Sequence, residues 1–343
     1  MAERLLEVND LNVRFATEDG IVRAVEGISF ELERGKVLGI VGESGSGKSV
    51  TAMTLMGLTR GVNARFEGEV LYKGKDLLKV SDADMQNYRG NELGMIFQDP
   101  MTSLNPVYRI GEQIVEAIQA HEKVDKRTAR ARTVELLRQV GIPNPETRVD
   151  SFPHEFSGGM RQRAMTAIAL SCNPSILIAD EPTTALDVTI QAQIVELINR
   201  LKDDFDSAVI FITHDLGVIA EIADEIIVMY AGRVVERGSK RDIFYDPQMP
   251  YTWGLLGSIP RLDRPRPERL HTIEGAPPSL INAPEGCKFR PRCPHAFEKC
   301  REEPGLENRV ETPGHFDRCW LDVEYKRAHR DETTSPGGTV EAA

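Results

Sequence analysis

The stretch GESGSGKS, residues 42–49, constrains the fold of this chain more than any other feature. It fits the pattern G-x-x-x-x-G-K-S/T at every fixed position. It follows the short apolar run VLGIVG, typical of a strand buried on both faces, and precedes the apolar helical stretch SVTAMTLMGL. The glycines allow successive backbone N–H groups to turn toward a polyanion, and the start of the helix adds partial positive charge. The segment therefore predicts a phosphate-binding loop at the edge of an α/β sheet.

The loop also predicts how a nucleoside triphosphate and its metal are bound. We expect Lys48 to reach the β- and γ-phosphates and Ser49 to offer its hydroxyl to Mg²⁺. An ordinary glycine-rich turn would need neither the lysine nor this position between a strand and a helix. The loop residues expected to contact ATP are Gly42, Ser44, Gly45, Gly47, Lys48, Ser49 and Val50.

A second apolar strand, SILIAD at residues 175–180, ends in the carboxylates Asp180 and Glu181. Strands of a parallel sheet present such residues at their carboxyl ends, where ligands bind. Asp180 suits the Mg²⁺ shell, and Glu181 suits a general base that polarises the attacking water. Taken alone, two acidic residues would equally fit a solvated strand end, but the upstream phosphate loop favours a catalytic site.

The order of the remaining patterns predicts the domain organisation. LLEVNDLNVRF and AVEGISFELERG alternate as strands do, residues 110–140 are rich in helix formers, and AVIFITHD at 208–215 is another buried strand. This alternation predicts a mostly parallel sheet with helices on both faces. We expect a nucleotide-binding domain over 1–240 with a helical subdomain at about 100–165, a proline-rich, loop-rich extension over 241–322, and a disordered tail over 323–343.

Composition excludes some functions. The formal net charge of −11 disfavours nucleic acid as a partner. No apolar run approaches the roughly 20 residues that a membrane-spanning helix needs. The first residues, MAERLLEVNDLNVRF, contain too many charges for a secretory signal. These observations favour a cytoplasmic protein.

The segment FSGGMRQR, residues 156–163, resembles the signature motif of ATP-binding cassette (ABC) proteins. Ser157, Gly158 and Gly159 stand at the start of an expected helix and could bind an anion. In that family, the motif contacts the nucleotide of the neighbouring subunit. Met160 stands where glutamine is common, outside the Ser-Gly-Gly donors.

Other landmarks of the ABC family occur in sequence order. Gln98, after the strand GMIF, resembles the glutamine that contacts the metal and water and senses the membrane subunits. His214 resembles the histidine that holds the γ-phosphate and water in line, and residues 184–187 resemble the loop that faces the opposite monomer. Phe15 resembles the aromatic residue that stacks on adenine, although its alternation with Leu11 and Val13 equally suits a core position. The resemblance implies catalytic roles for Lys48, Gln98, Glu181 and His214, and Mg²⁺ contacts for Ser49, Gln98 and Asp180. It also implies an α/β, P-loop ABC ATPase core with an antiparallel β subdomain and a helical subdomain.

Within the ABC family, the chain is most similar to the ATPase subunits of oligopeptide and dipeptide importers. The short separation of Gln98 and Ser157 leaves no room for the long coiled coil of chromosome-organising ATPases, and a single phosphate loop disfavours twin-cassette translation factors. The tract QDPMTSLNP and the extension containing DPQMPYTWGLLGSIPR resemble the peptide importers, although nickel and glutathione importers share the extension in part. This implies a homologous second cassette, two permease subunits, an extracytoplasmic peptide-binding protein and a peripheral location on the cytoplasmic face of the membrane.

Four of the five cysteines lie close together in the extension: Cys287, Cys293, Cys300 and Cys319. A reducing cytoplasm disfavours disulfides, and four thiolates would satisfy a four-iron four-sulfur (4Fe–4S) cluster, which some peptide-importer ATPases resembling this segment carry. Zinc, with help from His295 or His315, and unligated thiols remain alternatives. The basic residues that could offset the charge of a cluster are Lys288, Arg290, Arg292, Lys299 and Arg301. We expect Cys172 to be a small core residue.

Overall fold

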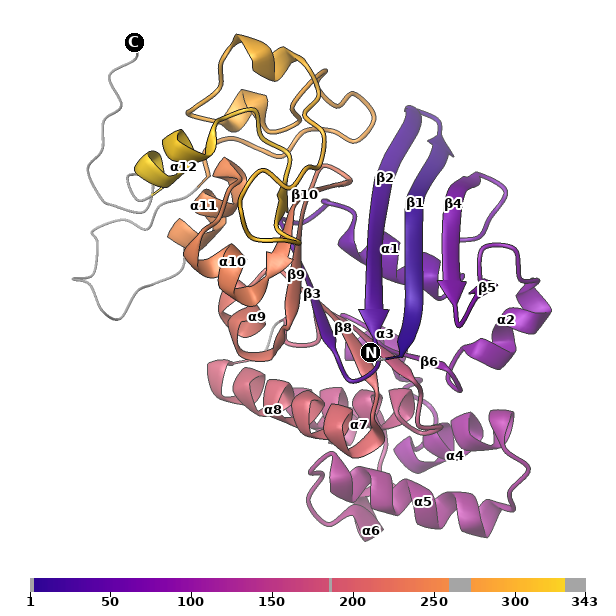
Figure 1. Ribbon diagram of the computed structural model, residues 1–343. Coiled ribbons are helices and arrows are strands. Elements are labelled where there is room, and N and C mark those ends of the chain that lie inside the picture. The colour runs from indigo at the N-terminus through magenta and orange to yellow at the C-terminus, as the bar shows by residue number, and fades with distance from the viewer. Residues whose placement is uncertain (1–2, 185–186, 259–272, 331–343) are drawn as a thin grey trace.

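The computed structural model describes residues 3–184, 187–258 and 273–330 (Figure 1). Its centre is a seven-stranded sheet in the order β11-β10-β9-β3-β8-β7-β6. Neighbouring strands from β9 to β6 run parallel, while β10 and β11 extend the sheet in antiparallel fashion. The bounds are β3 Val37–Val41, β6 Leu93–Ile96, β7 Ile176–Asp180, β8 Ala208–Thr213, β9 Glu225–Tyr230, β10 Arg233–Ser239 and β11 Phe316–Asp317.

The apolar runs form strands because the sheet is covered on both faces. Every residue of β8 is buried. Val209 and Phe211 pack into the core on one face of the sheet, whereas Ile210 and Ile212 pack into the core on the other. A strand in this position has no solvent-facing side, which explains its continuous apolar sequence. The mostly parallel sheet predicted from the sequence is confirmed.

A separate four-stranded antiparallel sheet, in the order β2-β1-β4-β5, covers one face of the central sheet. Its strands are β1 Arg4–Thr17, β2 Gly20–Glu33, β4 Ala64–Tyr72 and β5 Lys75–Asp76. Helix α1, Lys48–Leu55, contributes Ala52 and Leu55 to the same core. The predicted antiparallel β subdomain is therefore present.

Helices cover the other face and form one end of the molecule. The expected helical stretch is present as α4 and α5, which lie with α6 at the lower end of Figure 1, opposite the C-terminal extension. The helices of this part are α3 Pro100–Ser103, α4 Ile110–His121, α5 Lys126–Gln139, α6 Pro145–Arg148, η1 Pro153–Glu155, α7 Gly158–Ala169, α8 Val188–Phe205 and α9 Leu216–Ile222. Helix α2, Asp82–Tyr88, instead lies near β5 (Figure 1) and contributes Met85 to the core beneath the four-stranded sheet. Of the helices in the described ranges, none has both the length and the apolar character needed to cross a bilayer.

After β10 the chain is largely irregular. It contains α10 Lys240–Tyr245, α11 Pro250–Gly257, the short helices η2 Arg290–Arg292 and η3 Glu298–Arg301, and α12 Val323–His329. Strand β11 returns to the central sheet and pairs Asp317 with Glu236 of β10. The extension is thus joined to the cassette by backbone pairing.

One expectation for the tail is wrong. The sequence predicted disorder from residue 323, but helix α12 begins there. The Asp322 carboxylate caps the helix by accepting a hydrogen bond from the Tyr325 N–H, and the fully buried Lys326 donates to Asp317 at 2.7 Å. These contacts order a polar segment that has little apolar surface of its own. Residues 331–343 lie outside the described residues.

Candidate functional site

The phosphate loop joins β3 to α1, as its sequence predicted. Two of its glycines are required by close backbone approach. Gly42 has φ +152°, and a Cβ there would lie 2.2 Å from the Met229 carbonyl oxygen; at Gly47, φ is +101° and a Cβ would lie 2.4 Å from the Ala24 carbonyl oxygen. Any side chain at either position would displace the loop from its neighbours.

Lys48 is buried at the first position of α1. Its Nζ donates to the carbonyl oxygens of Gly42 at 2.7 Å and Glu43 at 3.0 Å, and lies 3.9 Å from a carboxylate oxygen of Glu181. Burial lowers the pKa of Lys48, although the nearby carboxylates oppose that shift. The ammonium group is therefore held inside the loop, where phosphate oxygens could replace the two carbonyls.

The two residues expected to hold Mg²⁺ through a hydroxyl and a carboxylate lie in contact. The Ser49 hydroxyl donates to Asp180 Oδ1 at 2.9 Å. Burial raises the pKa of Asp180, while this hydrogen bond acts in the opposite direction. A divalent cation at the same oxygens would favour the ionised carboxylate. The residue types and their convergence fit a hard cation.

Glu181 lies at the centre of the remaining predicted catalytic residues. It adopts φ +47°, an uncommon conformation for a residue with a side chain. Its Oε2 accepts hydrogen bonds from Gln98 Nε2 at 3.1 Å and the Thr184 hydroxyl at 2.9 Å, and lies 3.3 Å from His214 Nδ1. The hydrogen bond with His214 lowers the pKa of Glu181 to about 2 despite partial burial, and raises the pKa of His214. Glu181 is consequently ionised at neutral pH and able to accept a proton from water.

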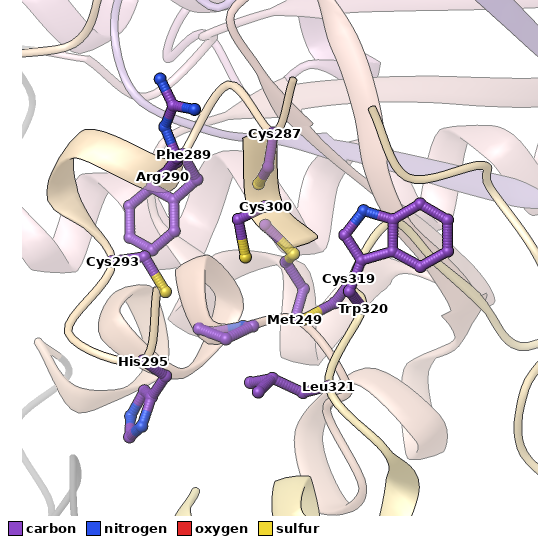
Figure 2. A pocket seen from close by; sticks show the side chains of 11 residues that line it. Met249, Cys287, Phe289, Arg290, Cys293, His295, Cys300, Cys319, Trp320 and Leu321 are labelled. Carbon is purple, nitrogen blue, oxygen red and sulfur yellow. The ribbon is translucent and has the colours of Figure 1, made fainter. Parts of the chain in front are cut away.

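The four cysteines of the extension face a single cavity of about 10 Å³ (Figure 2). Phe289 and Trp320 also line it, and all four thiols are free. Burial raises the pKa values of Cys287 and Cys293, and raises the pKa of Cys319 to about 12. Cys287, Cys293 and Cys319 are therefore protonated in the absence of a cation.

The fit of this cavity to a metal group is incomplete. Four converging thiols are a suitable donor set for iron–sulfur chemistry. However, a cavity of this volume accommodates about one water molecule, and within the described ranges no three Cys, His, Asp or Glu side chains are arranged to hold a metal ion. His315, an alternative zinc ligand in the sequence, instead contacts Glu236 at 2.8 Å.

One set of contacts with the phosphate loop could not be predicted from the sequence. Arg292 was expected to offset the charge of a cluster, but its guanidinium pairs with Glu43, the second residue of the loop. The Tyr251 hydroxyl accepts a hydrogen bond from the N–H of Glu43. No local pattern in the sequence marks either contact.

Comparison with known proteins agrees with this geometry. The family model described as "ABC transporter" matches residues 25–184, and "Oligopeptide/dipeptide transporter, C-terminal region" matches residues 235–300. The oligopeptide transport ATP-binding protein OppD of Bacillus subtilis is 54% identical over 320 residues, which cover 93% of this chain and 89% of that protein. The dipeptide transport ATP-binding protein DppD of the same organism is 51% identical over 93% of this chain and 95% of its own length. The chain belongs to the oligopeptide/dipeptide family of ABC transporter ATP-binding proteins. The family resemblance seen in the sequence is confirmed.

A solved ABC cassette confirms the fold class. The dimeric structure of MJ0796, a bacterial ABC transporter cassette, has a TM-score of 0.62 and 26% identity, covering 69% of this chain and 99% of that chain.

The structure does not bring every predicted ATP contact to the phosphate loop. Ser157 and Gly158 are exposed at the start of α7, and among the described residues no hydrogen bond or ion pair joins them to the loop. Gly159 is partly buried beside Ile190. Phe15 is half-buried on β1 and packs against the core, which leaves both interpretations of this residue open. Ala185 and Leu186, in the expected inter-subunit loop, lie outside the described residues.

Proposed function

We propose that this ABC protein is the ATP-hydrolysing subunit of a membrane importer for dipeptides or oligopeptides. The observation that carries the proposal is the ionised Glu181, held by Gln98 and His214 beside the phosphate-loop residue Lys48. The relatives named as oligopeptide and dipeptide transport proteins support the cargo class. A nickel or glutathione importer with the same ATPase is the alternative.

The geometry supports specific roles in hydrolysis. Backbone N–H groups of the loop and the Lys48 ammonium group would bind the phosphates, and Ser49, Asp180 and Gln98 would hold Mg²⁺, which neutralises phosphate charge. Glu181 would polarise the attacking water. His214, which lies 3.3 Å from that carboxylate, would keep it ionised and oriented.

The assembly we propose contains a homologous second cassette in a heterodimer, two permease subunits and an extracytoplasmic peptide-binding protein. The exposed start of α7 would contact the nucleotide of the second cassette. Exposed apolar side chains gather after Gln98, at Met101, Val107 and Tyr108, and would suit contact with a permease. We place the protein peripherally on the cytoplasmic face of the membrane, with the cassette over 1–240 and the extension over 241–322.

The test is ATP hydrolysis by the chain reconstituted in lipid with its permease, partner cassette and binding protein. We expect dipeptides or oligopeptides to raise the rate, and Ni²⁺, glutathione or DNA to leave it unchanged. Stimulation by Ni²⁺ or by glutathione, with no response to peptides, would favour the alternative importer. Stimulation by DNA alone would contradict a transport function.

We also propose that Cys287, Cys293, Cys300 and Cys319 ligate a 4Fe–4S cluster, for which the thiols would have to move apart and ionise. Their convergence in the reduced state supports this. Anaerobic purification should yield a brown protein that absorbs at about 400 nm. Cys300→Ser should remove the colour, whereas Cys172→Ser, a cysteine outside the cavity, should retain it. A colourless protein with stoichiometric zinc would contradict the proposal.

A further inference from the structure

Arg292 connects the C-terminal extension to the phosphate loop across 249 residues of sequence. Its Nη1 and Nη2 donate to the two carboxylate oxygens of Glu43 at 2.6 and 3.0 Å. The Arg292 side chain is only 5% exposed. This paired geometry makes the contact stronger and more directional than a surface ion pair.

Glu43 is held at its main chain as well as at its side chain. Its N–H donates to the Tyr251 hydroxyl at 2.9 Å. Its carbonyl oxygen accepts from Lys48 Nζ at 3.0 Å and from the Ser46 N–H at 3.2 Å. The conformation of Glu43 therefore determines where one of the two carbonyl partners of Lys48 lies. Two of the groups that hold Glu43, on Arg292 and Tyr251, come from the chain beyond β10.

Arg292 is itself fixed on all sides. Its Nε donates to the Glu274 carbonyl at 2.9 Å, and its Nη2 also donates to the Ile273 carbonyl at 3.2 Å. The Tyr230 hydroxyl lies 3.3 Å from Nη1. The hydrogen bond with Glu43 raises the pKa of Arg292, so its charge is permanent. A fixed guanidinium group can restrain the loop without rearranging when nucleotide arrives.

Aromatic packing carries this rigidity to Tyr251. The ring of Phe289 lies 5.4 Å from each of the Tyr230 and Tyr251 rings, and these two rings lie 4.6 Å apart. Phe289 directly precedes η2, the short helix that ends in Arg292. One packed unit of the extension thus presents both contacts to Glu43.

We propose that Arg292 is a positioning residue for ATP binding, which acts through Glu43 to hold the phosphate loop in its nucleotide-binding shape. The inference rests on the proposed ATP hydrolysis at this site. Without the pair, the loop must become ordered when ATP binds, and that ordering reduces the affinity. The loss should appear in ATP affinity and KM, while kcat changes little, because Arg292 contacts none of Gln98, Glu181 or His214 in the described structure.

The test is a double-mutant cycle on the full chain, with MgATP affinity measured by titration calorimetry. We expect Arg292→Ala and Glu43→Ala each to weaken binding by about tenfold, because each removes the same charge-assisted pair. The double variant should bind MgATP with an affinity no lower than that of the single variant with the lower affinity. Arg301→Ala is the matched control, since that arginine belongs to the same extension but pairs with the exposed Glu298; it should leave affinity unchanged.

Independent losses that multiply in the double variant, or unchanged affinity in Arg292→Ala, would overturn the inference. If Arg292→Ala lowers the unfolding temperature so far that binding cannot be measured, the MgATP affinities of Arg292→Lys and Glu43→Ala test the inference instead. The lysine retains the charge but not the paired geometry, and should weaken binding by less than Glu43→Ala does. Failure of the unmodified chain to bind MgATP would instead count against the proposed function.

Discussion

Glu181 is the side chain on which the proposed chemistry depends most directly, because its carboxylate contacts Gln98, Thr184 and His214. Glu181→Gln should leave MgATP affinity nearly unchanged and lower hydrolysis by at least about 100-fold, since a general base is lost but no phosphate ligand is. Affinity and turnover are measured on the assembled complex. The control is Glu196→Gln, an exposed carboxylate on α8. Turnover close to that of the unmodified complex would show that Glu181 is not the base.

Residues that act through local motifs could be predicted from the sequence. Lys48 comes shortly after the buried strand β3, and Asp180 ends the buried strand β7. Both strands pair in parallel with β8, which lies between them, so their carboxyl ends meet at one edge of the sheet. Arg292 could not be predicted in this way. Its partner lies far away in the sequence, and the pairing exists only because the extension folds back over the loop.

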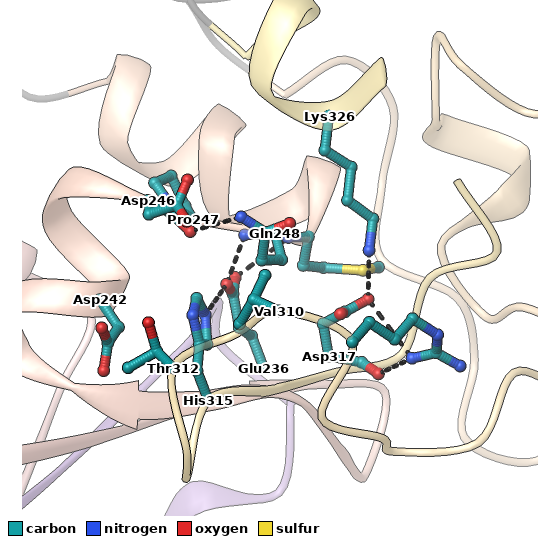
Figure 3. A network of polar contacts seen from close by, with 12 residues as sticks. Glu236, Asp242, Asp246, Pro247, Gln248, Val310, Thr312, His315, Asp317 and Lys326 are labelled. Carbon is teal, nitrogen blue, oxygen red and sulfur yellow. Dashed lines mark hydrogen bonds and ion pairs between the residues drawn. The ribbon is translucent and has the colours of Figure 1, made fainter. Parts of the chain in front are cut away.

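At the scale of elements, a buried ion pair attaches β11 to the cassette (Figure 3). His315 Nε2 lies 2.8 Å from Glu236 Oε1, and both side chains are at most 1% exposed. Burial alone would lower the pKa of His315, but the hydrogen bond to Glu236 and the negative charges of Glu236, Asp242 and Asp317 together outweigh it and raise the pKa. The stabilisation is therefore complete below the unfolded value of about 6.5 and is lost as pH rises through the raised folded value. Burial also raises the pKa of the neighbouring Asp317 from 3.8 to about 6, so the contribution of this carboxyl group to stability falls as pH rises between those two values, below the range in which His315 titrates.

His315→Gln should weaken this pH dependence. Glutamine keeps a hydrogen-bond donor but cannot gain charge. The unfolding temperature of the variant should therefore fall less than that of the unmodified chain between about pH 6 and about pH 8. Thermal unfolding across this range gives the comparison. His154→Gln, at an exposed position, should follow the unmodified chain. Parallel curves for His315→Gln and the unmodified chain would mean that the imidazole does not titrate in the folded state.

Elements with strong apolar patterns could also be predicted, and short ones could not. The runs that form β3, β7 and β8 are apolar except for Asp180 and Thr213 at the ends of the last two, because both faces of these strands are buried. Strand β11 has only two residues and carries no periodicity. The position of β11 in the sheet and the position of α12 after it depend on buried contacts and not on any repeat in the sequence. Asp317 of β11 contacts Lys326 of α12 (Figure 3) and also pairs with Arg309.

At the scale of the whole molecule, the phosphate loop and the predicted signature residues share no hydrogen bond or ion pair within the described ranges. The phosphate loop is held by the extension, whereas Ser157 and Gly158 are exposed at the start of α7. A chain of this design is expected to bind ATP by itself but to hydrolyse it only when a second cassette supplies the missing donors. The solved relative with the same fold is described as dimeric.

Gly158→Asp should separate these two steps. A Cβ at this position would have no atom within 4 Å, and an acidic residue in the first turn of α7 is favourable for the helix, so the chain should fold normally. Calorimetry should show an MgATP affinity within about twofold of the unmodified chain, because the chain's own phosphate loop is untouched. ATP hydrolysis by the assembled complex should fall by at least about tenfold, because the new carboxylate repels the phosphates bound to the second cassette. Lys48→Ala should behave in the opposite way and lose affinity in the isolated chain. If Gly158→Asp weakens binding to the isolated chain as much as Lys48→Ala does, the start of α7 serves the chain's own nucleotide, and the two-cassette arrangement is wrong.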